Sequence, residues 1–249
     1  MFKKNLVLLV SVLTLVFASQ ALGAGKLVNG IDANFPPFAY IDKTGQPSGF
    51  DVEAVNWVAK EIGVEVSHQP IEWDGIITSL LTKKIDIIAS GMSITEERAK
   101  KVNFSVPYWV IKQVMVTKNG SALSIEDLLK GKKTIGVQQG TSEAKWLKAE
   151  AAEKGWNFEL RYYSSSPLAV EDVLNGRIDA AAMDDAPAKD AVSKKDVQIV
   201  GSFGMHDEEF GYAVRKDDKE LLEKVNKALT KLMAAPAWNE LIKKYELDK

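Results

Sequence analysis

Two stretches of the chain follow the same pattern, and this repetition constrains the fold more than any other feature. Residues 84–91 and residues 177–184 each begin with a basic residue after a helical segment, continue with Ile-Asp and small apolar residues, and end in polar or small residues. A short, wholly apolar run is typical of a strand buried on both faces. Strands that alternate with helices form parallel βαβ units, so two such series predict two similar α/β lobes.

The segments around these two stretches alternate in the same way. Apolar residues three and four positions apart indicate helices, whereas short alternating or wholly apolar runs indicate strands. We expect strands at 26–32, 64–66, 85–89, 134–137, 158–163, 178–184 and 210–214. We expect helices at 51–62, 73–81, 142–151, 166–175, 217–232 and 238–242. The helices after residue 214 have no sheet of their own, so they are expected to pack on one of the lobes.

The first 24 residues have the composition of a secretory signal peptide. Lys3 and Lys4 form a positive n-region, residues 6–17 form an apolar h-region, and small residues follow at positions 21, 23 and 24. The apolar run is too short, and wrongly flanked, for a membrane span. We expect cleavage after Gly23 or Ala24 and a periplasmic location for the exported chain.

Charge and cysteine content exclude several classes of protein. Removal of Lys3 and Lys4 leaves 30 basic and 34 acidic residues, a net charge of −4. That balance argues against binding to nucleic acid or to an anionic membrane surface. The chain has no cysteine, which excludes disulfides, thiolate metal sites and lipid attachment at a cysteine.

The stretch from Ser90 to Arg98 is the first candidate for a binding site. A strand that ends in small residues and leads into a helix leaves several backbone N–H groups free to bind an anion. Ser93 and Thr95 are both good N-cap residues, and Ser93 with Glu96 would form a capping box. Arg98 would lie in the first turn, where it could form a bidentate pair with a carboxylate. The alternative is an ordinary capped helix with a solvated arginine.

Other polar and aromatic side chains follow the ends of the remaining strands. Ligands of open parallel sheets bind at the carboxyl ends of the strands, in the crevice between units. Arg98 stands on one lobe as a partner for a carboxylate, and Asp184 stands on the other as a partner for an ammonium group. Phe35 and Trp73 lie between them. This set of groups suits a free α-amino acid.

Each of these residues also has a purely structural alternative. Asp184 could cap the helix that follows it, and Trp73 could be only a core anchor. Thr141 and Ser142 could do no more than cap a helix. Phe35 is harder to explain in this way, because it lies in a loop next to two prolines.

The sequence contains no catalytic motif that we recognise. It has no Gly-x-Ser-x-Gly, phosphate loop, His-Glu-x-x-His or Gly-x-Gly-x-x-Gly pattern. With no cysteine and only two distant histidines, a metal cluster is not expected. We therefore expect no catalytic residues, no metal and no cofactor.

At this point a set of motifs identifies a family. The chain resembles the extracytoplasmic polar-amino-acid-binding proteins of ABC importers, solute-binding family 3, over essentially its whole length after the leader. The motifs that carry the resemblance stand at 49–53, 73–75, 93–98, 103–108, 139–142 and 178–184. The resemblance implies a type II periplasmic-binding-protein fold, with two lobes of mostly parallel sheet flanked by helices and a two-stranded hinge. Lobe 1 is then expected at 25–111 and 204–249, and lobe 2 at 112–203.

The resemblance also implies roles for individual residues. Arg98 looks like the arginine that binds the ligand carboxylate, Asp184 like the acceptor of the α-ammonium group, and Phe35 and Trp73 like the aromatic pair around the side chain. Asp32 resembles the acid that faces the distal end of the ligand. The expected ligand-binding residues are Asp32, Phe35, Trp73, Ser90, Gly91, Ser93, Arg98, Gln139, Ser142 and Asp184, and Gln138 borders the same loop.

The expected function is that of a monomeric periplasmic receptor which delivers one amino acid to an ABC permease. Asp32 with two aromatic residues favours a cationic side chain, that of arginine, lysine or histidine, and leaves glutamine open. The main alternative is an enzyme that resembles cyclohexadienyl dehydratases, with Glu143 or Asp185 as the acid. A receptor sensor domain is not expected, because no membrane span follows the leader.

Overall fold

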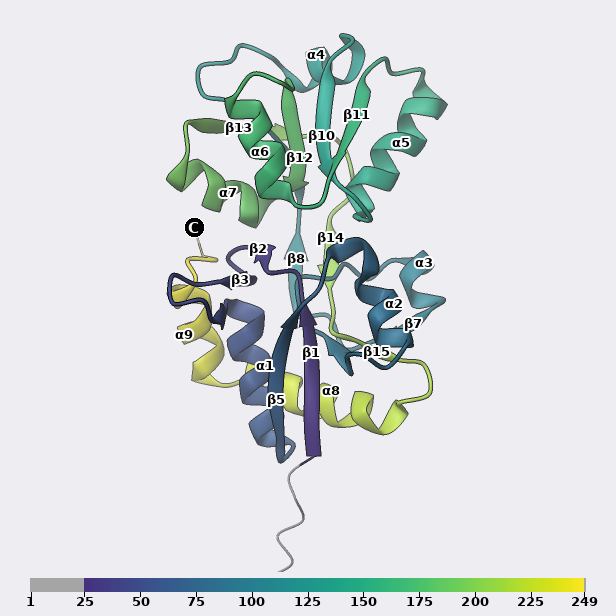
Figure 1. Cartoon of the computed structure of the whole chain (residues 1–249), viewed down its shortest axis with the longest axis vertical. Coiled ribbons are helices and arrows are strands. Elements are labelled where there is room, and N and C mark those ends of the chain that lie inside the picture. The colour runs from purple at the N-terminus through teal and green to yellow at the C-terminus, as the bar shows by residue number, and fades with distance from the viewer. Residues whose placement is uncertain (1–24, 249) are drawn as a thin grey trace, which may run out of the picture.

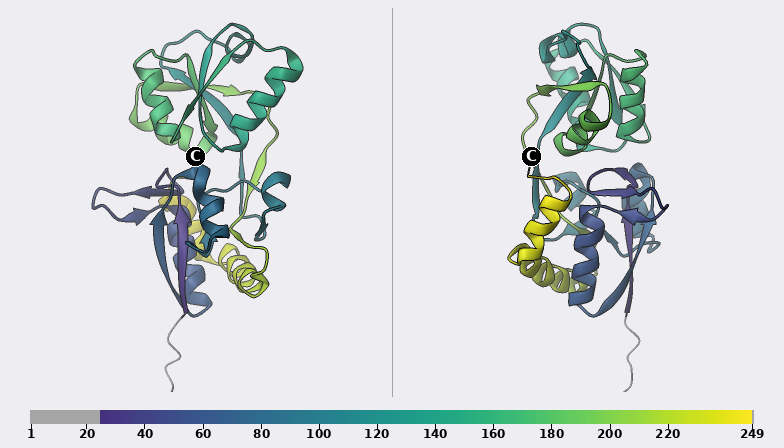
Figure 2. Two further views of the ribbon diagram at one scale, coloured as in Figure 1. Left: turned by 45° about the vertical axis from the view of Figure 1, so that its right-hand side comes forward. Right: turned by 90° about the vertical axis from the view of Figure 1, so that its left-hand side faces the viewer.

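The computed structural model describes residues 25–248 and consists of two lobes, one above the other in Figure 1. The expected signal peptide, residues 1–24, lies outside the described residues. The chain passes between the lobes along β8 (Trp109–Ile111) and β14 (Glu208–Phe210), which pair antiparallel as a separate two-stranded sheet. The two views of Figure 2 show the same connection from the side. This is the two-stranded hinge that the resemblance implied.

The first lobe is built on a five-stranded sheet in the order β5-β1-β6-β15-β7. Its strands are β1 (Gly25–Ile31), β5 (Val64–Pro70), β6 (Ile87–Ile88), β7 (Val102–Phe104) and β15 (Ala213–Arg215). The three strands β5, β1 and β6 are parallel, whereas β15 runs antiparallel to both of its neighbours. Strand β15 belongs to the segment that returns from the second lobe, so the C-terminal part of the chain completes the first sheet.

The second lobe repeats this arrangement with the order β11-β10-β12-β9-β13. Its strands are β9 (Gln113–Lys118), β10 (Thr134–Gln138), β11 (Glu159–Tyr163), β12 (Ala180–Asp184) and β13 (Val197–Ser202). Strands β11, β10 and β12 are parallel, and β9 pairs antiparallel with both β12 and β13. In each sheet the antiparallel member is a strand that enters directly from the other lobe.

Helices cover both faces of each sheet (Figure 1). In the first lobe these are α1 (Phe50–Glu61), α2 (Ile76–Leu81), α3 (Glu96–Ala99), α8 (Lys219–Met233) and α9 (Pro236–Lys244), with a 3-10 turn η1 at Trp73–Gly75. In the second lobe they are α4 (Ile125–Lys130), α5 (Ser142–Lys154), α6 (Ser166–Leu174) and α7 (Asp185–Lys194). The amphipathic helices α8 and α9 pack beside α1.

Strand β6 is buried on both faces, as the apolar run at 85–89 predicts. Ile87 and Ile88 are both fully buried, but they belong to different core clusters. Successive side chains of a strand point to opposite faces, so Ile87 packs toward α1 and α8 while Ile88 packs toward α2. The end of the strand, just before Ser90, is therefore fixed by packing on both faces.

Two local expectations differ from the structure. The single strand expected at 210–214 is two strands, because β14 ends at Phe210 and β15 begins at Ala213, so that one segment serves first the hinge and then the sheet. A small sheet of β2 (Asn34–Phe35), β3 (Ala39–Ile41) and β4 (Pro47–Ser48) was not expected, because its strands are too short to show a period. Within residues 25–248, no helix has both the length and the apolar character needed to cross a membrane.

Candidate functional site

A cavity lies between the two lobes, at the carboxyl ends of β1, β6, β10 and β12. It holds about 20 Å³, which is room for about one water molecule. Most of the side chains that line it are polar or charged. They are Asp32, Phe35, Trp73, Ser90, Gly91, Ser93, Arg98, Gln138, Thr141, Ser142, Glu143, Ser166 and Asp184.

Nine of the ten residues expected from the sequence line this cavity, and Gln139 does not. The side chain of Gln139 is exposed, and its Nε2 donates to Asp74 at 3.0 Å on the outer side of the cleft. Gln138, the last residue of β10, faces the cavity instead. Neighbouring residues of an extended chain point in opposite directions, so only one of the two glutamines can reach the cavity.

Arg98 is buried, and the backbone of both lobes holds its guanidinium group. Nη1 donates to the carbonyl of Ser93 at 3.0 Å, and Nη2 donates to the carbonyl of Gly140 in the second lobe at 3.3 Å. The guanidinium carbon lies 5.4 Å from the centre of the Trp73 ring, within cation–π range. Arg98 is therefore not the solvated arginine of the structural alternative.

Helix α3 begins differently from one sequence expectation. Thr95 is its N-cap and accepts from the Arg98 N–H at 3.3 Å, so the capping box of Ser93 with Glu96 is wrong. Ser93 instead forms a β-bridge with Phe210. Because α3 spans only four residues, its dipole adds little, and the positive charge at this end of the cavity comes from Arg98.

A buried carboxylate fixes the backbone between β6 and α3. Asp51, the second residue of α1, accepts from the Gly91 N–H at 2.6 Å and from the Tyr108 hydroxyl at 2.8 Å. Gly91 has a φ of 58°, and a Cβ atom there would lie 2.3 Å from the Phe35 ring. Burial raises the pKa of Asp51 to about 7, although these two hydrogen bonds oppose the shift. The Gly91 N–H therefore points at Asp51 and is not available to a ligand.

Asp32 follows β1 in the first lobe and contacts the second lobe across the cavity. Its Oδ2 accepts from Gln138 Nε2 at 2.7 Å across the cleft, and its Oδ1 accepts from the Asn34 N–H at 3.0 Å. The Ser90 hydroxyl accepts from the Asp32 N–H at 2.9 Å. Burial raises the pKa of the Asp32 carboxyl, and the Gln138 amide opposes that shift.

Asp184 occupies the N-cap position of α7 but makes no side-chain capping hydrogen bond. Its Oδ1 accepts from Gln113 Nε2 at 3.0 Å, and the same amide lies 3.4 Å from an oxygen of Glu208. Glu208 Oε2 also accepts from the Ser142 hydroxyl at 2.6 Å. Burial raises the pKa of Asp184 well above its ordinary value, and the nearby Glu143 carboxyl adds to the rise. The capping alternative for Asp184 is thus wrong.

Thr141 and Ser142, which the sequence predicted either as ligand contacts or as helix caps, have different roles in the structure. Thr141 is the N-cap and accepts from the Ala144 N–H at 3.4 Å, whereas Ser142 reaches toward the hinge. Glu143 is buried against the cavity. Burial raises the pKa of Glu143 to about 7, and the charge of Glu208 contributes to the rise while Arg98 opposes it.

The two aromatic residues of the cavity are both partly core residues. The Phe35 ring stacks on Phe38 at 5.7 Å and meets Phe210 edge-on at 6.2 Å. Trp73 belongs to the cluster that contains Ile76 and Leu80. Each of these residues therefore belongs to a core cluster and also lines the cavity.

Several residues of the site were not among the sequence expectations. Glu143 was considered only as an enzymatic acid, and Gln113 and Glu208 were not named as site residues. Gln113 carries a signal in the sequence, because it is a polar residue immediately before the apolar residues 114–116. Within residues 25–248, no group of three histidine, aspartate or glutamate side chains is arranged to hold a metal ion.

The chain is similar to bacterial proteins that bind small molecules outside the cytoplasm. The family model for bacterial extracellular solute-binding proteins, family 3, matches residues 27–248. The L-cystine-binding protein TcyJ of Escherichia coli (strain K12) is 36% identical over 211 residues, which are 84% of this chain and 77% of that protein. The L-arginine-binding protein of Pseudomonas aeruginosa is 35% identical over 255 residues, covering 97% of this chain and 96% of the other.

A solved structure has the same architecture. It is that of an ancestral amino-acid-binding protein described as a precursor of cyclohexadienyl dehydratase, with a TM-score of 0.82 and 37% identity. The match covers 89% of this chain and 95% of that one.

Proposed function

Because this chain belongs to family 3 of the bacterial extracellular solute-binding proteins, we propose that it is a periplasmic receptor for a free cationic L-amino acid, with arginine first. In this role it delivers the amino acid to the membrane permease of an ABC importer. The named relatives are binding proteins rather than enzymes, and they bind cystine, arginine or histidine. The ligand of this chain must therefore be argued from its own cavity.

The charge of the cavity is the observation that carries the proposal. Three carboxyl groups line it, those of Asp32, Glu143 and Asp184, and Arg98 is the cation among the lining residues. When all four of these groups are ionised, the cavity carries a net charge of −2. A zwitterion such as glutamine leaves that imbalance unchanged, whereas an amino acid with a cationic side chain reduces it.

The positions of these groups support one orientation of the ligand. Arg98 would bind the α-carboxylate, and Asp184 would accept from the α-ammonium group, because these two residues stand on facing lobes. The side chain would then extend between Phe35 and Trp73 toward Asp32. A guanidinium group suits the part of the cavity next to Asp32, because it can stack on an aromatic ring and donate to the carboxylate at the same time.

The arrangement of the lobes supports binding by hinge closure. We propose that residues 25–111 and 204–249 move as one lobe and 112–203 as the other, about the pair β8 and β14. A cavity of about 20 Å³ is too small for an amino acid, so the lobes must part before a ligand enters. Ligand contacts to both lobes then favour the closed form. We expect the receptor to act as a monomer.

A thermal-shift panel tests the proposal. The purified protein is heated with each of the twenty amino acids and with cystine. A ligand at one hundred times its Kd stabilises the folded state by about 2.7 kcal/mol, so a true ligand stands out clearly. We expect arginine to give the largest shift, with lysine or histidine next. A larger shift with cystine or glutamine would contradict the cationic assignment, and no shift with any of them would contradict the receptor function.

One observation favours a second candidate, the dehydratase activity considered above. Glu143 is a buried carboxyl whose pKa is raised to about 7, and it lies in the same cavity as an arginine that could hold a substrate carboxylate. Incubation with arogenate and prephenate, followed by detection of phenylalanine and phenylpyruvate, distinguishes the two. We expect no product above that formed without protein.

A further inference from the structure

Glu143 belongs to a group of buried charged residues that meet at the hinge side of the cavity. Glu143 lies in the first turn of α5, Asp184 at the end of β12, Glu208 on β14 and Arg98 on α3. Their exposed fractions are 4%, 8%, 7% and 5%. Four elements from both lobes therefore bring three carboxyl groups and one guanidinium group together with little exposure to water.

The hydrogen bonds within this group do not neutralise the carboxyl groups. The side-chain hydrogen bonds of Arg98 go to the backbone carbonyls of Ser93 and Gly140. Asp184 and Glu208 share one neutral donor, Gln113 Nε2, at 3.0 and 3.4 Å. The other end of that amide, Oε1, is buried and has no hydrogen-bond partner among the described residues. The cluster thus holds more acceptors than donors, and this is the condition under which a carboxyl group keeps its proton.

Glu143 and Asp184 are the two members whose ionisation the surroundings oppose. The first turn of a helix ordinarily favours a carboxylate, and the hydroxyl of Thr141 and the backbone of Glu143 do favour it here. Burial outweighs these contacts and raises the pKa of Glu143 to about 7, helped by the charge of Glu208 and opposed by Arg98. Asp184, beside Asp185 and Gln113, is shifted in the same direction, and Glu143 contributes to that shift.

An added ammonium group would reverse this balance. It would supply the positive charge and the hydrogen-bond donors that the cluster lacks, close to Asp184 and Glu143 together. We propose that Glu143 is a recognition residue for the α-ammonium group, and that it releases its proton to solvent when the amino acid binds. The O–H bond of the carboxylic acid breaks, the proton passes to buffer, and the carboxylate then faces the ammonium group. This inference rests on the proposed function.

Calorimetry in two buffers tests the proposal, because it counts the protons exchanged on binding. L-Arginine is titrated into the protein at pH 7 in phosphate and in Tris, whose ionisation enthalpies differ widely. For the wild type we expect a clear difference in binding enthalpy, corresponding to the release of a substantial fraction of a proton per arginine. In Glu143→Gln, which keeps the shape and loses the acid, we expect this number to fall by at least half.

Two controls separate this role from a structural one. Glu126 also lies in the first turn of a helix of the second lobe, but it is exposed and pairs with Lys130 at 2.8 Å. Glu126→Gln should therefore release as many protons as the wild type. The second control is 5-guanidinopentanoate, which is arginine without its α-ammonium group, and its binding to the wild type should release fewer protons than arginine does.

The possible failures are distinguishable. Arginine binding with no proton release in the wild type would overturn the role of Glu143, and so would equal release in the wild type and Glu143→Gln. Equal release with arginine and with 5-guanidinopentanoate would overturn the assignment to the ammonium group. The absence of binding heat with arginine in either buffer would overturn the proposed function itself. The wild-type measurements decide the matter even if the glutamine variant folds poorly.

Discussion

At the scale of single residues, the site depends on charged groups that the protein itself does not neutralise. Arg98 and Asp184 are both buried, and neither has an oppositely charged side chain within hydrogen-bond distance among the described residues. A buried charge without a partner is costly to the folded protein. The arrangement makes sense if a zwitterionic ligand completes both pairs.

Arg98→Ala and Asp184→Ala should each weaken ligand binding by about 2–5 kcal/mol, because each change leaves one charge of the bound ligand buried without its partner. Titration calorimetry with arginine measures the loss. Arg161 is an exposed arginine on β11, and Arg161→Ala should bind with wild-type affinity. Near-normal affinity in the Arg98 or Asp184 variant would contradict the proposed orientation.

Asp51 predicts a pH dependence of stability. Its pKa rises from 3.8 to about 7 on folding, so the folded state binds a proton that the unfolded state has lost. This contribution to stability is fully present below pH 4 and is lost as the pH rises through 7. In Asp51→Asn it should be absent.

Urea unfolding of both proteins at pH 5, 6, 7 and 8 measures this effect. The free energy of unfolding of the wild type should fall relative to that of Asp51→Asn as the pH rises. Glu143 and Asp184 shift in the same direction but are present in both proteins, so the difference isolates Asp51. A constant difference across this pH range would refute the assignment.

The sequence predicted the cavity-lining residues that stand at the ends of strands. It did not predict those whose place in the cavity is decided by packing. Asp32, Ser90 and Asp184 follow strands, and the ends of parallel strands meet at one edge of a sheet. The choice between Gln138 and Gln139 depends on the direction of one side chain. Glu143 looked like any acid in the first turn of a helix, and only the burial of α5 against the other lobe distinguishes it.

At the scale of elements, the register of β9 against β12 positions the acid of the second lobe. The antiparallel pairing places Gln113 directly opposite Asp184. Residues opposite each other across two strands have their side chains on the same face, so the Gln113 amide reaches the Asp184 carboxyl. Gln113, the first residue of β9, thus orients the Asp184 side chain in the cavity.

Gln113→Ala should lower the free energy of unfolding by about 1–3 kcal/mol, because it removes a donor that two buried carboxyl groups share. It should also weaken arginine binding, since Asp184 loses its orientation. Denaturant unfolding and calorimetry measure the two effects. Gln46 is exposed in a loop of the first lobe, and Gln46→Ala should change neither. An unchanged affinity in Gln113→Ala would show that Asp184 does not depend on β9.

Most of the long helices could be predicted from the sequence, but the six-residue strand β13 was not expected. The helices α1, α6 and α8 carry apolar residues at helical spacing, and the strands β1, β10 and β12 are short, largely apolar runs. Strand β9 was not among the expected strands, and the antiparallel direction of β15 cannot be derived from its local sequence pattern. The two- and three-residue strands β2 to β4 depend on contacts that no local pattern shows.

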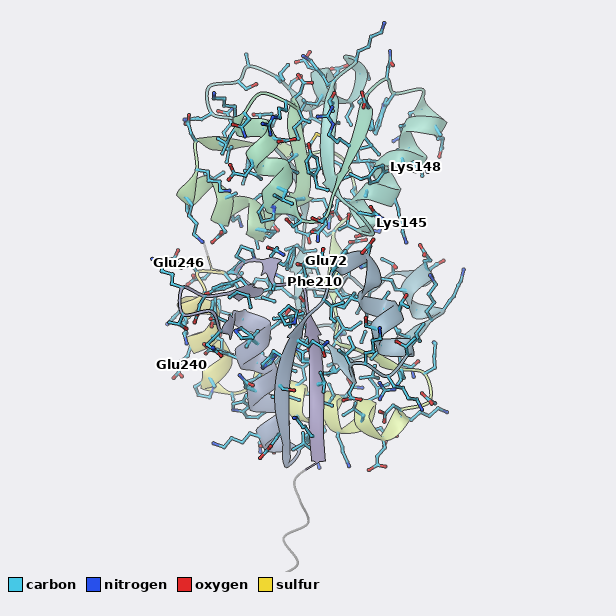
Figure 3. The ribbon with its side chains drawn as sticks, in the orientation of Figure 1. Glu72, Lys145, Lys148, Phe210, Glu240 and Glu246 are labelled. Carbon is cyan, nitrogen blue, oxygen red and sulfur yellow. The ribbon has the colours of Figure 1, made fainter. Side chains whose placement is uncertain are left out.

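At the scale of the whole molecule, side-chain contacts join the two lobes across the cleft. Asp32 with Gln138 and Asp74 with Gln139 join the lobes at 2.7 and 3.0 Å, and Lys145 pairs with Glu97 at 2.5 Å. Figure 3 shows Lys145 at the end of α5 that faces the first lobe. Lys145 and Glu97 are each 52% exposed, so their pair contributes at most about 1 kcal/mol.

The proposed hinge closure requires that contacts of this kind let the lobes part when a ligand enters. Small-angle X-ray scattering should therefore show a larger radius of gyration without arginine than at saturation. The physical reason is that only a bound ligand completes the buried charge pairs on both lobes. Identical scattering curves, with binding demonstrated on the same sample, would contradict hinge closure.

The central claim is that the cavity selects a free amino acid with a cationic side chain. Calorimetric titration with arginine and with citrulline tests it most directly, because citrulline has nearly the same shape and lacks only the side-chain charge. We predict saturable binding of one arginine per chain, at least about tenfold tighter than that of citrulline, a difference of about 1.4 kcal/mol. Equal affinities for the two, or no binding of arginine, would contradict the account.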